Sequence, residues 1–240
     1  MSYLLSISFI IIVIYLLFKN PKYTLPIDKI IFKIILYEVI AAILVSLSSF
    51  FLEEPLSNLF TSSSATYILV ENFITVAPLE ELAKFIAVYI ATKGFKSLRR
   101  KEDILFYLLF SACIFSALEN LLYIFIYDGD LLLALLRNFV STPCHLFYSI
   151  VFGFFYTLYL QHHTYKIGYF LQGLFFASFF HGFMNFCLCY YTYTQSLLGL
   201  IFACVVLGSF YLIGAELIKR HLEKSLYAVQ IAECEEVESL

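Results

Sequence analysis

Long apolar runs follow one another through most of this 240-residue chain and leave few folds open to it. A helix needs about 20 mostly apolar residues to cross the hydrocarbon core of a bilayer. Hydrophobic residues make up 62% of the chain and charged residues only 14%, which excludes a soluble enzyme, and the net charge of −3 excludes a nucleic-acid binder. We expect an all-α, polytopic transmembrane helical bundle of about seven spans, from the runs 3–18, 31–52, 66–91, 104–127, 131–160, 168–190 and 197–218.

The run 131–160 is too long for one straight span. Pro143 lies inside it, and a proline removes a helical hydrogen bond and clashes with the preceding turn. We therefore expect an interfacial piece at 131–141, followed by a span that begins near residue 143.

Lys and Arg lie on alternate loops, and the positive-inside rule orients the bundle from them. The loops 53–65, 128–130 and 191–196 carry neither residue, whereas the loops on the other side hold 13 of the 15 basic residues. This pattern predicts an N-terminus outside and a C-terminus in the cytoplasm. We expect one transmembrane domain over residues 1–222 and a short acidic cytoplasmic tail over 223–240.

Ionisable residues in the middle of a span cost roughly 2.5–3.5 kcal/mol on insertion scales, so those that remain there face a cavity or a partner. Glu80 and Glu81 precede Lys84 by four and three residues, so both carboxylates can reach its ammonium along one flank of the helix. Two carboxylates against one lysine leave a surplus negative charge, which a structural ion pair does not need. The surplus favours a functional site over a structural one.

Three further spans each carry polar residues at a similar depth. They are Glu119 and Asn120, then His145, then His181 and Asn185, the last two spaced to share one helix face. At about 1.5 Å per residue, the polar groups of all four spans lie roughly 16–22 Å from the cytoplasmic ends of their helices. We therefore expect them to meet in one layer slightly outside the midplane of the membrane.

The other charged residues are interpreted as structural. Arg137 lies nearer the outer boundary, where a long basic side chain commonly anchors the helix by reaching the interface. Glu38, Lys33 and Glu216 lie near cytoplasmic ends of spans, and we expect no part for them in the site.

Taken in order, the four motifs resemble those of the PrsW family of intramembrane proteases, within the wider CAAX protease and bacteriocin-processing group. The stretches that carry the resemblance fall within residues 78–185 and are Pro78-Leu79-Glu80-Glu81-Leu82-Ala83-Lys84, Phe115-Ser116-Ala117-Leu118-Glu119-Asn120, Pro143-Cys144-His145 and His181-Gly182-Phe183-Met184-Asn185. The CAAX-type branch matches less well, because its expected patterns are E-E-x-x-x-R and F-x-x-x-H, whereas this chain has Lys84 and Glu119.

The resemblance implies an intramembrane endopeptidase that hydrolyses a peptide bond within or beside the bilayer. The substrates it implies are single-span membrane proteins, such as anti-sigma factors, cleaved on the outer side to start a signalling cascade. The location it implies is a bacterial cytoplasmic membrane.

Amide hydrolysis needs an activated water and donors for the developing oxyanion. We expect Glu80 or Glu81 to act as the general base, with Glu119 sharing or holding the water. Lys84 and Asn120 have supporting roles.

His181 and Asn185 are the expected oxyanion donors, with His145 as an acid or an orienting group. A metal-dependent mechanism uses the same residues, because carboxylates and histidines suit a divalent ion, zinc above all. The metal ligands would then come from Glu80, Glu81, Glu119, His145 and His181. The sequence leaves the metal-free and the metal-dependent mechanisms open.

Two other functions fit the same buried polar cluster. A proton-coupled transporter could use the carboxylates and histidines as a relay, although the chain shows no paired halves or repeated broken helices. A non-catalytic membrane scaffold could keep the fold without the chemistry. The retention of three costly carboxylates favours the enzyme.

Overall fold

The part of the chain that the structure describes is almost entirely helical and contains no strand, which confirms the predicted fold class. The computed structural model describes residues 1–19, 28–61, 64–93, 101–161, 165–194, 197–199, 201–214 and 216. Two short π-helices, η1 and η2, lie between α-helices, and a last helix, Leu197–Gly214, follows α8. The elements in order are α1 (Ser2–Lys19), α2 (Asp28–Leu59), α3 (Ala65–Val70), η1 (Glu71–Val76), α4 (Ala77–Thr92), α5 (Lys101–Ile126), α6 (Leu131–Leu136), η2 (Arg137–Ser141), α7 (Thr142–Gln161) and α8 (Lys166–Thr194).

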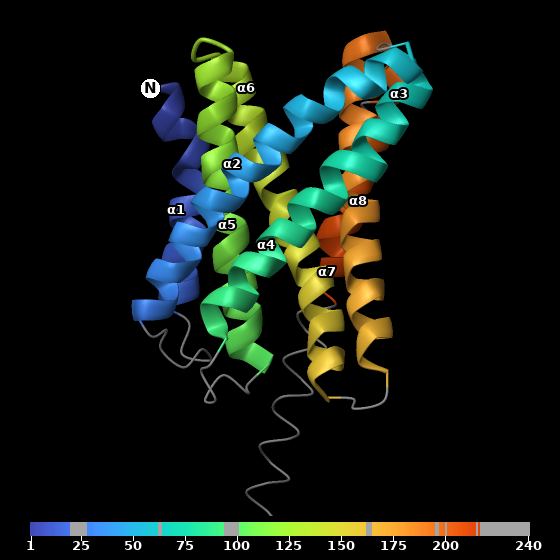
Figure 1. The fold of residues 1–240 in the computed structure, drawn as a ribbon. Helices are drawn as coiled ribbons and strands as arrows, with labels where there is room; N and C mark the ends of the chain where they lie inside the picture. Colours follow the sequence, from blue (N-terminus) through green and yellow to red (C-terminus); the bar gives the residue numbers. More distant parts are fainter. Residues whose placement is uncertain are drawn as a thin grey trace, which may run out of the picture.

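Six helices within the described ranges are long and apolar enough to cross a membrane. They are Ser2–Lys19, Asp28–Leu59, Asp103–Ile126, Leu131–Leu160, Lys166–Thr192 and Leu197–Gly214. The predicted span 66–91, which α3, η1 and α4 form, is not among them, because every 18-residue stretch of it carries at least three charged residues from the set Glu71, Glu80, Glu81 and Lys84. The three pieces follow one another without a gap, so this region still forms one rod among the other helices (Figure 1).

Each π-helix ends just before a proline. Pro78 is the second residue of α4, and Pro143 is the second residue of α7. The proline ring clashes with the carbonyl four residues earlier, and here both of those carbonyls belong to the wider π-helical turns. The helix therefore continues from Leu131 to Gln161 without a break, and η2 ends at Ser141, which is where the sequence predicted that the interfacial piece ends.

Two long tilted helices run across the bundle in Figure 1, α2 and, antiparallel to it, the rod made by α3, η1 and α4. α4 packs against α2, α5 and α8, and α7 packs against both α5 and α8. Aromatic rings fill much of the interior: the ring centroid of Phe85 lies 4.9–5.0 Å from those of Phe152, Tyr156 and Phe170. This packing places the four helices that carry the polar motifs beside one another.

α8 and η1 lie close together at Gly182. A Cβ atom at this position would lie 3.0 Å from the backbone oxygen of Asn72 and 3.1 Å from the ring of Phe73. The backbone oxygen has no rotamer through which to move away, so a methyl group here would force the backbone to shift by a few tenths of an ångström. The contact fixes the depth of α8 beside η1, directly next to His181.

We expect Gly182→Ala to destabilise the bundle by about 1–3 kcal/mol, because an added methyl group in a packed interior forces the backbone to shift. The midpoint of thermal unfolding in detergent micelles measures the effect. Gly208→Ala is the matched control, since no described atom lies within 4 Å of the Cβ position of Gly208. Equal losses in the two variants would contradict the close-approach argument.

Candidate active site

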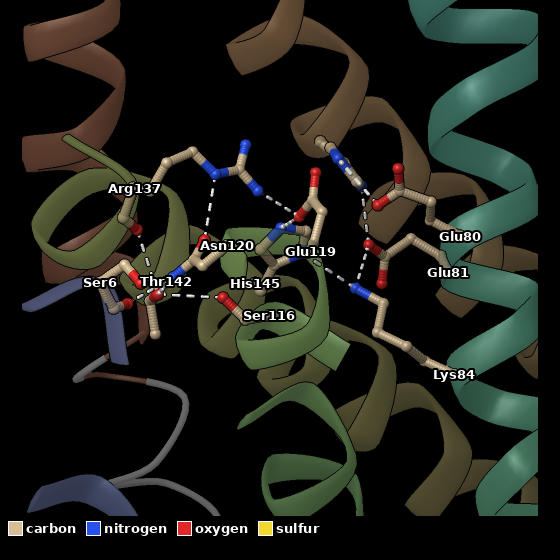
Figure 2. A network of polar contacts seen from close by, with 11 residues as sticks. Ser6, Glu80, Glu81, Lys84, Ser116, Glu119, Asn120, Arg137, Thr142 and His145 are labelled. Atoms are coloured by element: carbon tan, nitrogen blue, oxygen red, sulfur yellow. Dashed lines mark hydrogen bonds and ion pairs between the residues drawn. The ribbon is translucent and has the colours of Figure 1, made fainter. Parts of the chain in front are cut away.

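The polar motifs of the four helices meet in one buried network (Figure 2). A chain of hydrogen bonds and ion pairs links α4, α5, α7 and α8. The side chains that the sequence pointed to and that the structure brings together are Glu80, Glu81, Lys84, Glu119, His145 and His181.

Glu81 and Lys84 form the half of the network that lies on α4. The Lys84 ammonium lies 2.6 Å from Glu81 Oε1, and both side chains are only 2% exposed. The same carboxylate oxygen lies 2.8 Å from Nδ1 of His181, and the lysine Nζ lies 3.3 Å from Nδ1 of His145. Glu81 therefore already has a cation and a histidine as partners.

Glu119 on α5 is the second carboxylate that is bound in this way. Its Oε2 atom lies 2.8 Å from Nε2 of His145 and 2.5 Å from Nη2 of Arg137. The prediction that Arg137 is an interfacial anchor is wrong: its side chain is 13% exposed and turns inward to the site. The position near the end of a span was misleading, because the burial of Arg137 depends on how η2 packs against α5.

Glu80 differs from both of these carboxylates. It is buried, and its Oε2 atom has no hydrogen-bond partner among the described residues. The nearest ring nitrogen that faces it is Nε2 of His181, at 3.7 Å. Three carboxylates face two fixed cations in this network, and Glu80 is the one without a short ion pair to either cation.

Glu80, His145 and His181 could together hold a metal ion. Each offers one ligand atom, and these three atoms lie within 4.8 Å of one another. One carboxylate and two imidazoles form a donor set that suits zinc, and the unpartnered Glu80 oxygen is consistent with it. Of the five ligands expected from the sequence, Glu81 and Glu119 stand outside this group, because each instead holds a histidine nitrogen.

Two amide side chains of the motifs take different positions. Asn120 lies fully buried and donates to the Ser6 carbonyl at 2.8 Å and to Thr142 Oγ1 at 3.0 Å, so it joins α5 to α1 and α7. Asn185 is half-buried one turn after His181 on α8. Within the described chain it takes no part in the hydrogen-bond network.

Sequence reasoning missed two further residues. The ring of Tyr148 stacks on His181, with a centroid distance of 4.7 Å and an angle of 13°, and a tyrosine three residues after His145 was the available signal. Glu38 was expected to lie near a cytoplasmic end without a role. It is instead fully buried and accepts a hydrogen bond from the Ser111 hydroxyl, because its face of α2 packs on α5.

The helices and the network define a multi-pass membrane protein with a buried cluster of carboxylates and histidines. The sequence matches the family described as PrsW family intramembrane metalloprotease over residues 11–213, and the chain therefore belongs to this family. The resemblance predicted from the motifs is confirmed, and the protein is an integral membrane protein of a protease family. No curated protein and no solved structure matches the chain.

Proposed function

We propose that this protein is an endopeptidase that hydrolyses a peptide bond of a membrane-spanning substrate with an activated water. The observation that carries the proposal is the contrast between Glu80 and its two fellow carboxylates. Glu81 and Glu119 are bound by cations and histidines, whereas Glu80 faces the histidines with an uncommitted oxygen. Glu80 is therefore the group that takes the proton from the attacking water.

Glu80, His145 and His181 are the residues that would hold a divalent ion, zinc being the best fit to one carboxylate and two imidazoles. Such an ion, held by these residues, would supply Lewis-acid polarisation of the scissile carbonyl and would ease deprotonation of the water. If Oε2 of Glu80 bound the ion, the other carboxylate oxygen of Glu80 would have to accept the proton from the water. The metal-dependent mechanism is favoured over the metal-free one by this donor set and by the name of the family.

The other site residues orient His181 and supply a donor for the oxyanion. Glu81, paired with Lys84, holds Nδ1 of His181 and so leaves Nε2 facing Glu80. Asn185 follows one turn later on the same helix and supplies an amide donor for the developing oxyanion.

The substrate we propose is a single-span membrane protein such as an anti-sigma factor, and the location is a bacterial cytoplasmic membrane. The membership of the family supports both. The depth of the network, slightly to the outer side by the charge rule, supports cleavage toward the outer end of the substrate helix.

Labelling of new protein N-termini in cells tests the proposal. Cells with the native chain are compared with cells that carry Glu80→Gln at equal level, and Glu54→Gln serves as the matched control because Glu54 is exposed on α2. We expect termini near the outer end of a single span to disappear in Glu80→Gln and to persist in Glu54→Gln. Unchanged termini in the folded Glu80→Gln variant would point to a scaffold or a proton-coupled carrier instead.

Removal of metal is the companion test. Dialysis of the purified protein against a strong chelator is expected to abolish cleavage, and stoichiometric zinc is expected to restore it. Activity that persists through exhaustive chelation, with metal content verified by mass spectrometry, would return the choice to a metal-free glutamate mechanism.

A further inference from the structure

Arg137 is a charged member of the network that none of the motifs contains. It begins η2, and its guanidinium contacts three residues on one face of α5. Nη2 lies 2.5 Å from Glu119 Oε2, Nε donates to Asn120 Oδ1 at 3.0 Å, and the guanidinium carbon lies 4.2 Å from the centroid of the Tyr123 ring. A planar fork with contacts on three sides has little freedom to move.

Asn120, which accepts the hydrogen bond from Arg137 Nε, is itself held in place by two further hydrogen bonds. Its amide nitrogen donates both to the Ser6 carbonyl and to Thr142 Oγ1, which ties the contact to α1 and to the start of α7. Thr142 also donates to the carbonyl oxygen of Arg137 at 3.1 Å. The arginine is therefore fixed through both its side chain and its backbone (Figure 2).

The contacts of Glu119 determine which nitrogen of His145 carries hydrogen. An arginine stays charged in proteins, so the carboxylate beside it stays an ionised acceptor without a proton to donate. His145 Nε2 lies 2.8 Å from that carboxylate and must therefore be the donor. In the neutral ring the lone pair is then on Nδ1, which faces the Lys84 ammonium on the α4 side of the site.

We propose that Arg137 is a positioning residue that acts through Glu119: it keeps this carboxylate oriented so that His145 presents an unprotonated Nδ1 to the reaction centre. The expected effect of Arg137 on catalysis rests on the proposed function. Its expected effect on the tautomer of His145 does not. The inference assigns Glu119 an orienting part, in place of the water-holding or metal-binding part expected from the sequence.

The structural consequence is read from the ¹⁵N resonances of histidine in labelled protein in detergent, with His145→Gln identifying the signals of His145. We expect the native ring to carry hydrogen on Nε2 and not on Nδ1. In Arg137→Gln we expect a mixture of rings with hydrogen on Nε2 and rings with hydrogen on Nδ1. Lys166→Gln is the control, because Lys166 also lies over a tyrosine ring but outside the network.

The kinetic consequence is read with a quenched-fluorescence peptide that spans the cleavage site found by N-terminal labelling. Arg137→Gln is expected to lower kcat roughly 10–100-fold, as loss of a group that orients a ligand does, with KM changed less than about twofold. Arg137→Lys keeps the charge but not the fork, and we expect an intermediate loss. In a Glu119→Gln background the effect of Arg137→Gln should fall below about threefold, because the residue through which it acts is already altered.

The inference is overturned if folded Arg137→Gln keeps the native histidine spectrum and kcat. It is also overturned if the fold-losses in kcat of Arg137→Gln and Glu119→Gln multiply in the double variant. If Arg137→Gln does not fold, Arg137→Lys takes its place in the same comparisons. If the native chain cleaves no peptide, the proposed function fails, while the histidine spectrum still decides the part of Arg137.

Discussion

Replacing Glu80 by glutamine is expected to lower kcat by about 10³-fold, in the range typical for removal of a general base, while leaving the fold intact. Glutamine matches the carboxylate in shape, and the Oε2 atom that it replaces makes no hydrogen bond within the described chain. Kinetics with a peptide that contains the cleavage site, together with thermal unfolding in detergent, measure the two effects.

Glu81→Gln is the sharpest comparison, because it changes the neighbouring residue by the same atoms. Glu81 binds Lys84 and His181, so its substitution should lower stability as well as activity. If both variants lost equal stability, or if Glu80→Gln kept more than a tenth of the native kcat, the assignment of Glu80 as the base would be wrong.

Lys84→Met is expected to give the largest loss of stability, about 3–5 kcal/mol, because it leaves the carboxylate of Glu81 buried without its cation. Lys84 is 2% exposed and lies over the rings of Phe115 and Tyr148, so it has no route to water. Denaturant or thermal unfolding in mild detergent checks the loss.

The double variant Lys84→Met/Glu81→Leu separates lost charge pairing from lost packing. Replacing both members of a buried ion pair by apolar side chains is often nearly neutral, so we expect much of the lost stability to return. We expect the double variant to be inactive, because His181 has lost the acceptor for its Nδ1. A double variant no more stable than Lys84→Met would show that packing of the lysine stem dominates.

Much of this architecture could be predicted from the sequence because a membrane restricts both the length of a spanning helix and the polar residues within it. Apolar length predicted the helices, and the cost of charge in lipid singled out the carboxylates and histidines. Depth along four helices predicted that Glu81, Glu119, His145 and His181 would meet, since rise per residue is nearly constant in a helix. Their contacts at 2.8 Å agree with that estimate.

The rest depended on which face each helix buries, and the apolar pattern says little about this when the helix is hydrophobic on all sides. Arg137 and Glu38 lie toward helix ends, where an outward direction was the reasonable interpretation. Packing of α5 against η2 and α2 turned both inward. The different surroundings of Glu80 and Glu81 also needed coordinates, because adjacent residues in a motif carry no sign of their partners.

The two π-helices determine how α3 and α6 are rotated relative to α4 and α7, the helices that follow them. A π-helical turn holds about one residue more than an α-helical turn, and each residue rotates the helix by about 100°. α3 and α6 therefore present faces that are out of phase with those of α4 and α7, which carry the site. Deleting one residue within 71–76 or 137–141 would turn α3 or α6 by about a quarter of a revolution relative to α4 or α7. Pro78, Pro143 and the residues beyond them would keep their register, whereas Arg137 would turn with α6 and lose its contact with Glu119.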